Sequence, residues 1–185
     1  VKPMLKSVEH YICLDAPDAA VAEQLPDVQF YDELIAQQPA AFEWPVFDEQ
    51  TASSLCYTSG TTGNPKGVLY SHRSTLLHTM AICFPDSLSL SASDIVMPVV
   101  PMFHVNAWGL PYSCALVGCK LVLPAEKMDA VSLSELIANE GVTFSGGVPT
   151  IWTMYLDWLD KNDRRPDSLK KVVIGGSAVP RAMAE

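Results

Sequence analysis

The chain has 185 residues, of which 49% are apolar and 18% charged, so it can bury a core and is not typical of a disordered protein. It lacks both a signal-peptide pattern and the run of about eighteen apolar residues that crosses a membrane, which predicts a cytoplasmic protein. A net charge of −9 argues against nucleic acid bound on a broad basic face, although a local phosphate pocket stays compatible with it.

The N-terminal part of the sequence predicts few regular elements. Residues 8–14 favour a strand, an acidic connector follows, and residues 31–38 favour a short helix before a surface linker at 39–51. The chain starts without methionine, and a helix is only beginning after Pro180. We therefore expect an excerpt of a longer protein.

From residue 54 onward, strand-like and helix-like patterns alternate. The expected strands are 54–57, 68–70, 95–100, 120–123, 142–144 and 171–174. The expected helices begin at Ser71, near Ala107, at a Ser132/Glu135 capping box and at Pro149. This order predicts an α/β fold with mostly parallel sheets flanked by helices, whose ligands bind beyond the carboxyl ends of the strands.

One polar loop between two expected strands carries the clearest chemistry. Residues 57–67 read YTSGTTGNPKG and combine hydroxyl side chains, three glycines and Lys66. Glycine lets backbone N–H groups approach a phosphate, hydroxyls donate hydrogen bonds to it, and lysine adds positive charge. The Walker spacing of a nucleotide P-loop is absent, because Lys66 follows Pro65 and precedes Gly67. Composition alone would favour a flexible surface loop.

The whole string resembles the signature loop of the adenylate-forming superfamily, which includes acyl-CoA synthetases, luciferases and the adenylation domains of peptide synthetases. The resemblance implies that this loop binds the β- and γ-phosphates of ATP, with the Thr61 hydroxyl helping to bind Mg²⁺ and Lys66 assisting catalysis. The residues it assigns to the phosphates are Thr58, Ser59, Gly60, Thr61, Thr62, Gly63 and Lys66.

A second segment, 101–109 (PMFHVNAWG), resembles the acyl-site motif of fatty acyl-CoA synthetases in that superfamily. The resemblance implies that His104 lies near the carboxylate being activated, that Val105 lines an acyl tunnel and that Trp108 gates it. A wide apolar indole with one polar N–H suits such a role. Without the resemblance, His104 and Trp108 would be read as ordinary core residues.

A third segment, Gly175-Gly176-Ser177-Ala178, follows the last expected strand and resembles the adenine-contacting segment of the superfamily. A flat base can pack on bare backbone only where side chains are absent. A double glycine after a strand is also common in ordinary turns.

The resemblance places residues 1–185 in the large N-terminal domain of an adenylate-forming fatty acyl-CoA synthetase. It implies activation of a fatty acid by ATP and Mg²⁺ to an acyl-adenylate, then transfer to coenzyme A. The Tyr-Gly-x-Thr-Glu metal motif, the ribose-binding aspartate and the C-terminal domain with its catalytic lysine are absent from this sequence. We therefore expect these residues alone to be inactive.

Several alternatives stay open at this point. The acid could be an aryl or amino acid, the loop could serve a kinase or GTPase, or the chain could be a non-catalytic nucleotide-binding module. Homodimerisation and peripheral membrane contact are also left open by the sequence.

Overall fold

The computed structural model describes residues 7–58 and 63–184, and the chain divides into two compact units, with the division in the sequence between Val46 and Phe47. In the first unit, β1 (Tyr11–Cys13) and β2 (Val28–Phe30) pair in parallel, and α1 (Ala19–Gln24) and α2 (Tyr31–Ala36) accompany them. The expected strand at 8–14 is therefore confirmed at its centre. The expected connector was wrong, because it contains α1 and β2, both too short to show a periodic pattern.

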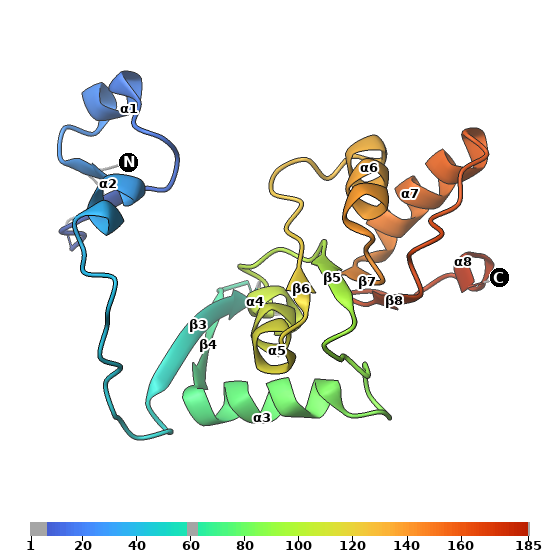
Figure 1. Ribbon diagram of the computed structural model, residues 1–185, viewed down its shortest axis with the longest axis horizontal. Helices are drawn as coiled ribbons and strands as arrows, with labels where there is room; N and C mark the ends of the chain where they lie inside the picture. The colour runs from blue at the N-terminus through green and yellow to red at the C-terminus, as the bar shows by residue number, and fades with distance from the viewer. Residues whose placement is uncertain (1–6, 59–62, 185) are drawn as a thin grey trace. The chain divides into compact units, whose positions relative to one another are not determined.

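The second unit begins with an antiparallel hairpin and continues as alternating strands and helices (Figure 1). Its elements are β3 (Ala52–Thr58), β4 (Lys66–Ser71), α3 (His72–Cys83), β5 (Ile95–Pro98), α4 (Val105–Trp108), α5 (Leu110–Val117), β6 (Lys120–Leu121), α6 (Ala130–Glu140), β7 (Phe144–Gly147), α7 (Pro149–Lys161), β8 (Lys171–Ile174) and α8 (Arg181–Ala184).

The hairpin of β3 and β4 confirms the expectation that two strands flank the polar loop. Cys56 pairs with Val68, and Thr58 at the end of β3 pairs with Lys66 at the start of β4. Ser71 then caps α3 in a capping box with Ser74, as its position before the helical pattern predicts.

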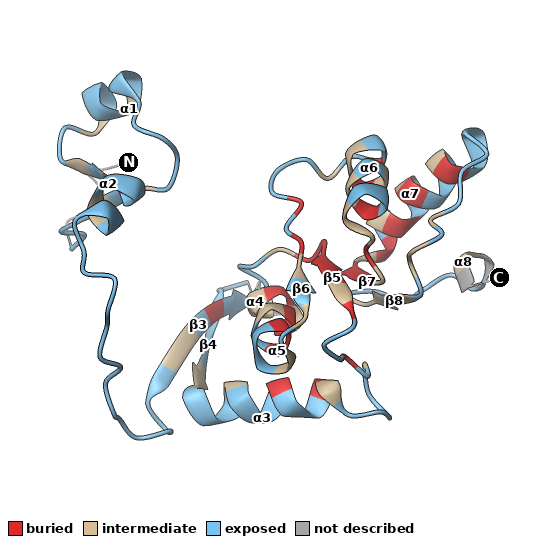
Figure 2. Ribbon diagram, viewed as in Figure 1, coloured by how far each residue is buried: buried red, intermediate tan, exposed pale blue. Residues whose placement is uncertain are grey.

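Four parallel strands in the order β6-β5-β7-β8 form the main sheet. Alternate side chains of β5 point to opposite faces: Met97 joins the core with α6 and α7, whereas Val96 packs with Leu110 and Cys114 of α5. Figure 2 shows the buried residues gathered on β5, β7 and the inner sides of α6 and α7. This sheet with helices on both faces confirms the α/β class.

Several sequence-based boundaries differ from the structure. α5 begins at Leu110 rather than near Ala107, because residues 105–108 form a separate left-handed turn. α6 is capped by Asp129, whose carboxylate accepts from the Ser132 N–H, rather than by a Ser132/Glu135 box. β7 starts at Phe144, two residues later than expected. None of the helices in the described ranges is long and apolar enough to cross a membrane.

Candidate functional site

The acyl-site and adenine-contacting segments meet at one edge of the main sheet. β5, β7 and β8 are parallel, so their carboxyl ends lie at the same edge. Residues 101–109 follow β5 there, and residues 175–178 follow β8. The structure thus brings together two segments that are far apart in the sequence, at the edge where α/β sheets bind their ligands.

The Trp108 indole lies across the bare backbone of this edge. A Cβ atom at Gly175 would lie 3.1 Å from Cη2 and 3.2 Å from Cζ2 of Trp108, and one at Gly146 would lie 3.6 Å from Cε3. The indole can occupy this place because both positions lack a side chain. The Gly175 backbone therefore contacts Trp108, while Gly176, Ser177 and Ala178 lie exposed beyond it.

A left-handed backbone turn presents Trp108 to the sheet. Residues 105–108 have φ values of 49°, 52°, 52° and 56°, and Gly109 continues the turn at 72°. This conformation costs L-residues other than glycine roughly 1–2 kcal/mol each, and Val105 is disfavoured further because it is β-branched. Such strain persists only where surrounding contacts impose it, and it concentrates at functional sites.

Asn106, in the middle of the turn, is bonded to the hairpin. Its Nδ2 donates to Ser54 Oγ at 3.0 Å, and its Oδ1 accepts from Cys56 Sγ at 3.6 Å. Ser54 and Cys56 are two residues apart on β3 and therefore share a face of the strand. The acyl-site segment is thus joined to the strand that leads into the phosphate loop.

The described ends of the phosphate loop are consistent with anion binding. Thr58 and Lys66 are exposed, and Thr58 Oγ1 donates to the Lys66 carbonyl at 3.5 Å. Gly63 has φ of +93° and open space where a side chain would stand, so a phosphate can approach its backbone. No described residue forms an ion pair with Lys66, which leaves its charge for a ligand.

The central residues of this loop, Ser59, Gly60, Thr61 and Thr62, lie outside the described residues. Their phosphate contacts and the Mg²⁺ role of Thr61 stay predictions. Among the residues that the structure describes, no group of three or more histidine, cysteine, aspartate or glutamate side chains could hold a metal ion.

His104 is exposed at the start of the left-handed turn. Its backbone N–H donates to the Pro101 carbonyl at 3.0 Å, and its own carbonyl accepts from Ala107. The imidazole is not used to cap α4. Its exposure contradicts the reading of His104 as a core residue, and its role at the carboxylate stays a prediction.

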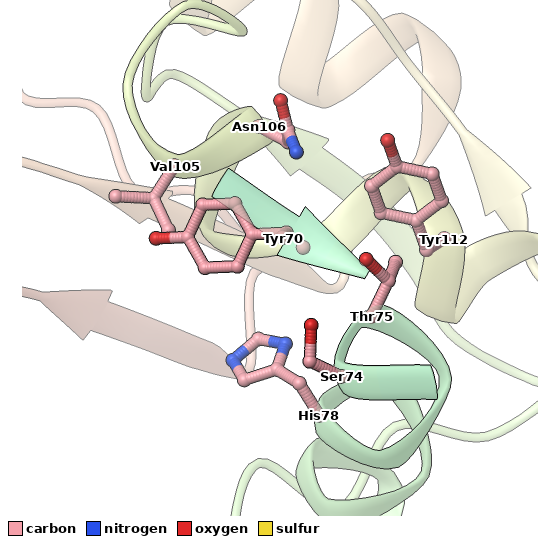
Figure 3. A pocket seen from close by; sticks show the side chains of 8 residues that line it. Tyr70, Ser74, Thr75, His78, Val105, Asn106 and Tyr112 are labelled. Atoms are coloured by element: carbon pink, nitrogen blue, oxygen red, sulfur yellow. The ribbon is translucent and has the colours of Figure 1, made fainter. Parts of the chain in front are cut away.

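A cavity of about 130 Å³ lies beside the same turn, and its exposed lining is mostly apolar. We call it the α3–α5 cavity, and Figure 3 shows the side chains around it. They come from β4, α3, the left-handed turn and α5, and are Tyr70, Ser74, Thr75, His78, Val105, Asn106 and Tyr112, with Gly109 completing the wall. Val105, the predicted tunnel residue, is one of the residues that line this cavity.

Sequence reasoning missed two residues of this region. His78 lines the cavity and packs on Gly109, where a Cβ would lie 2.7 Å from Nδ1 of the ring. Its spacing from Ser74 and Thr75 on α3 places the three on one helical face, which is the signal that could have indicated it. Asn106 carried no local signal, since its partners are on β3.

A family model described as "AMP-binding enzyme" matches residues 1–185. The chain belongs to this family. This assignment agrees with the resemblance of residues 57–67 to the signature loop of adenylate-forming enzymes.

Two curated relatives of this AMP-binding chain are acyl-CoA ligases. It is 53% identical over 179 residues to a medium-chain-fatty-acid–CoA ligase of Ectopseudomonas oleovorans, covering 97% of this chain and 33% of the relative. It is 52% identical over 183 residues to a 3-methylmercaptopropionyl-CoA ligase of Ruegeria lacuscaerulensis, covering 99% of this chain and 34% of the relative. The chain therefore spans about a third of these relatives.

A solved structure shares the fold. The inhibitor-bound N-terminal domain of FACL13 from Mycobacterium tuberculosis superposes with a TM-score of 0.74 at 25% identity, covering 90% of this chain and 42% of that one. This likeness confirms the expected architecture, that of the N-terminal domain of an adenylate-forming enzyme.

Proposed function

We propose that the full-length protein containing this chain is an acid–thiol ligase that converts an aliphatic acid of the fatty-acid class to its coenzyme A thioester. The observation that carries the proposal is that the acyl-site segment contacts both the strand that leads into the phosphate loop and the adenine-contacting segment. Asn106 bonds the acyl-site segment to the phosphate-loop strand, and Trp108 packs it on Gly175. A carboxylate held near His104 would therefore lie between the predicted phosphate and adenine sites.

The proposed reaction has two steps. A carboxylate oxygen of the acid attacks the α-phosphorus of ATP, the bond from that phosphorus to the bridging oxygen breaks, and pyrophosphate leaves. The sulfur of coenzyme A then attacks the acyl carbon, the bond to AMP breaks, and the thiol proton passes to solvent. Mg²⁺ would neutralise phosphate charge when it is bound.

The residues of this chain would act chiefly by positioning and by electrostatics. Lys66 and the open backbone at Gly63 fit the departing phosphates, where fixed positive charge and N–H donors stabilise developing negative charge. His104 would orient the carboxylate. Holding the two reactants in line supplies much of the rate acceleration in such reactions.

The preference for an aliphatic acid is supported by the α3–α5 cavity. Its mostly apolar lining suits an alkyl chain, and its volume is about 130 Å³. The two relatives are named for medium-chain fatty acids and for 3-methylmercaptopropionate. We infer that the acid is aliphatic and of modest length, and a cytoplasmic location stays a prediction.

Acid-dependent pyrophosphate–ATP exchange by the full-length protein tests this function. The acid panel contains octanoate, 3-(methylthio)propanoate, benzoate and an amino acid, and the nucleotide product is identified. We expect exchange with an aliphatic acid and AMP as product. Exchange restricted to benzoate or amino acids would contradict the acid class, whereas ADP or GDP as product would contradict adenylation.

The matched lysine variants are Lys66→Met and Lys120→Met. Lys120 pairs with Glu140 at the surface, away from the predicted phosphate loop. Removing one preformed stabilising group typically lowers a rate by about 10²–10³-fold, so we expect that loss for Lys66→Met and none for Lys120→Met. Equal rates for the two variants would remove Lys66 from the mechanism.

A further inference from the structure

We propose that Asn106 is a positioning residue that sets the distance between the acid and the phosphates of ATP by tying the left-handed turn to β3. The inference rests on the proposed function and adds a residue to it. Neither the composition of the acyl-site segment nor its spacing points to Asn106. Its contacts do.

The tether is the Asn106 side-chain amide, whose nitrogen and oxygen both form hydrogen bonds with side chains of β3. Nδ2 donates to Ser54 Oγ at 3.0 Å and Oδ1 accepts from Cys56 Sγ at 3.6 Å. Cys56 is only 7% exposed, so its partner is held within the packed side of the hairpin. Both bonds cross about fifty positions of sequence and therefore fix tertiary rather than local structure.

The left-handed turn needs such a tether. Val105, Ala107 and Trp108 have no intrinsic reason to adopt positive φ, whereas asparagine adopts it more readily than most residues. The turn is therefore imposed by contacts made at its middle and at its end. Asn106 supplies the contacts to β3, and Trp108 supplies the packing on Gly175.

The tether joins the two predicted halves of the reacting system. β3 runs from Ser54 through Cys56 to Thr58, where the phosphate loop begins. Asn106 also lines the α3–α5 cavity next to Val105 (Figure 3). A shift of the turn would therefore move the cavity wall relative to the phosphates. In-line attack requires the reacting atoms to stand about 3–3.5 Å apart, so a small shift has a large effect.

The test measures steady-state adenylation by the full-length enzyme carrying Asn106→Ala. We expect kcat/KM for the acid to fall by about tenfold to a hundredfold, which is the range that misplacement of a reactant produces. The KM for ATP should stay within about twofold, because the phosphate loop itself is unchanged. A general structural defect would instead change the kinetic constants for both the acid and ATP and would also lower the melting temperature.

Two further variants separate the tether from the backbone conformation. Asn106→Gly adopts positive φ at little cost but has no side chain, so it should behave like Asn106→Ala. Ser54→Ala removes one partner only, so we expect a smaller loss in the same direction. The double variant Asn106→Ala/Ser54→Ala should be no worse than Asn106→Ala, because both changes remove the same bond. Asn162→Ala, at the end of α7, is the matched asparagine control and should match the wild type.

Three results would overturn the inference. One is wild-type acid kinetics in Asn106→Gly, which would assign the effect to backbone conformation alone. Another is an equal loss for acid and ATP. A third is additive losses in the double variant. A wild-type enzyme that shows no exchange with any acid would instead overturn the proposed function, and the inference would fail with it.

Discussion

Gly175 and Trp108 pack so closely that a side chain at position 175 and the indole at position 108 would compete for the same space. The indole lies so close to the Gly175 backbone that a methyl group there would stand 3.1 Å and 3.2 Å from two ring atoms. Those atoms belong to the outer six-membered ring of the indole. Glycine at this position is therefore explained by packing against Trp108, in addition to any contact that its neighbours make with adenine.

Gly175→Ala should consequently destabilise the carboxyl edge of the sheet. Overpacking of this kind costs about 1–3 kcal/mol, seen as a lower melting temperature of the full-length protein. Trp108→Phe removes the outer ring atoms and makes room for the methyl group. We expect the double variant to lose less stability than the sum of the two single losses. Strict additivity would show that the indole does not occupy this position in solution.

Among the elements, α6 shows how one side chain sets a helix start. Asp129 Oδ1 accepts from the Ser132 N–H at 3.0 Å, and Oδ2 accepts from the Ser132 hydroxyl at 2.6 Å. These hydrogen bonds lower the pKa of Asp129. The cap therefore contributes stability above the ordinary aspartate pKa, and that contribution disappears as pH falls through the lowered value.

We expect Asp129→Ala to loosen the first turn of α6 more than Ser132→Ala does. Ser132→Ala keeps the backbone bond to the carboxylate, whereas Asp129→Ala removes both bonds. Hydrogen exchange of the amides in α6, followed by mass spectrometry at neutral pH, measures this difference. Faster exchange in Ser132→Ala than in Asp129→Ala would restore the capping box predicted from sequence.

Elements whose cause is local could be predicted from the sequence, and those with distant causes could not. Gly141 ends α6, Pro149 opens α7 and Lys171–Ile174 forms β8, all as their local patterns predict. Local patterns predict a loop at 101–106 and a right-handed helix from about Ala107, so they miss the left-handed turn at 105–108. Its actual conformation depends on contacts with β3 and with Gly175, just after β8, which no local pattern encodes.

The same distinction applies to the candidate site. The loop at 57–67 could be assigned because its whole string resembles the signature loop of the adenylate-forming superfamily, whereas its composition alone indicates only a polar, glycine-containing loop. The link from Asn106 to Ser54 and the packing of Trp108 on Gly175 required the folded chain. The sequence therefore indicated the three motif segments one at a time. How these segments contact one another could be seen only in the folded chain.

In the second unit, the carboxyl ends and the amino ends of the main-sheet strands form two edges that carry different groups of residues. The carboxyl edge carries the acyl-site and adenine-contacting segments, whereas the amino edge carries a charged network centred on Asp94, just before β5. The Asp94 carboxylate accepts from the Ser91 N–H at 2.9 Å and from the Thr143 hydroxyl at 3.1 Å, and Lys171 Nζ lies 3.3 Å away. Lys171 also lies over the Phe144 ring at 5.6 Å. These contacts join the starts of β5, β7 and β8.

Lys171→Met should therefore lower stability without changing the KM for the acid. Burial raises the pKa of Asp94, but the hydrogen bonds from Ser91 and the charge of Lys171 lower it more, so the net pKa lies below its ordinary value. Its stabilising contribution is thus complete above the unfolded pKa of about 3.9 and is lost as pH falls through the folded value. Because Lys171 is partly exposed, we expect a loss of about 1 kcal/mol at neutral pH.

Melting temperatures measured from neutral pH into the acidic range should show the difference between the two proteins shrinking as pH falls through the lowered pKa of Asp94. Lys120→Met, which breaks the surface pair with Glu140, is the matched control and should cost roughly 0.5 kcal/mol or less. A stability difference for Lys171→Met that is constant with pH would show that the side chain acts through packing on Phe144 rather than through Asp94. A raised KM for the acid would show that the two edges of the sheet are coupled.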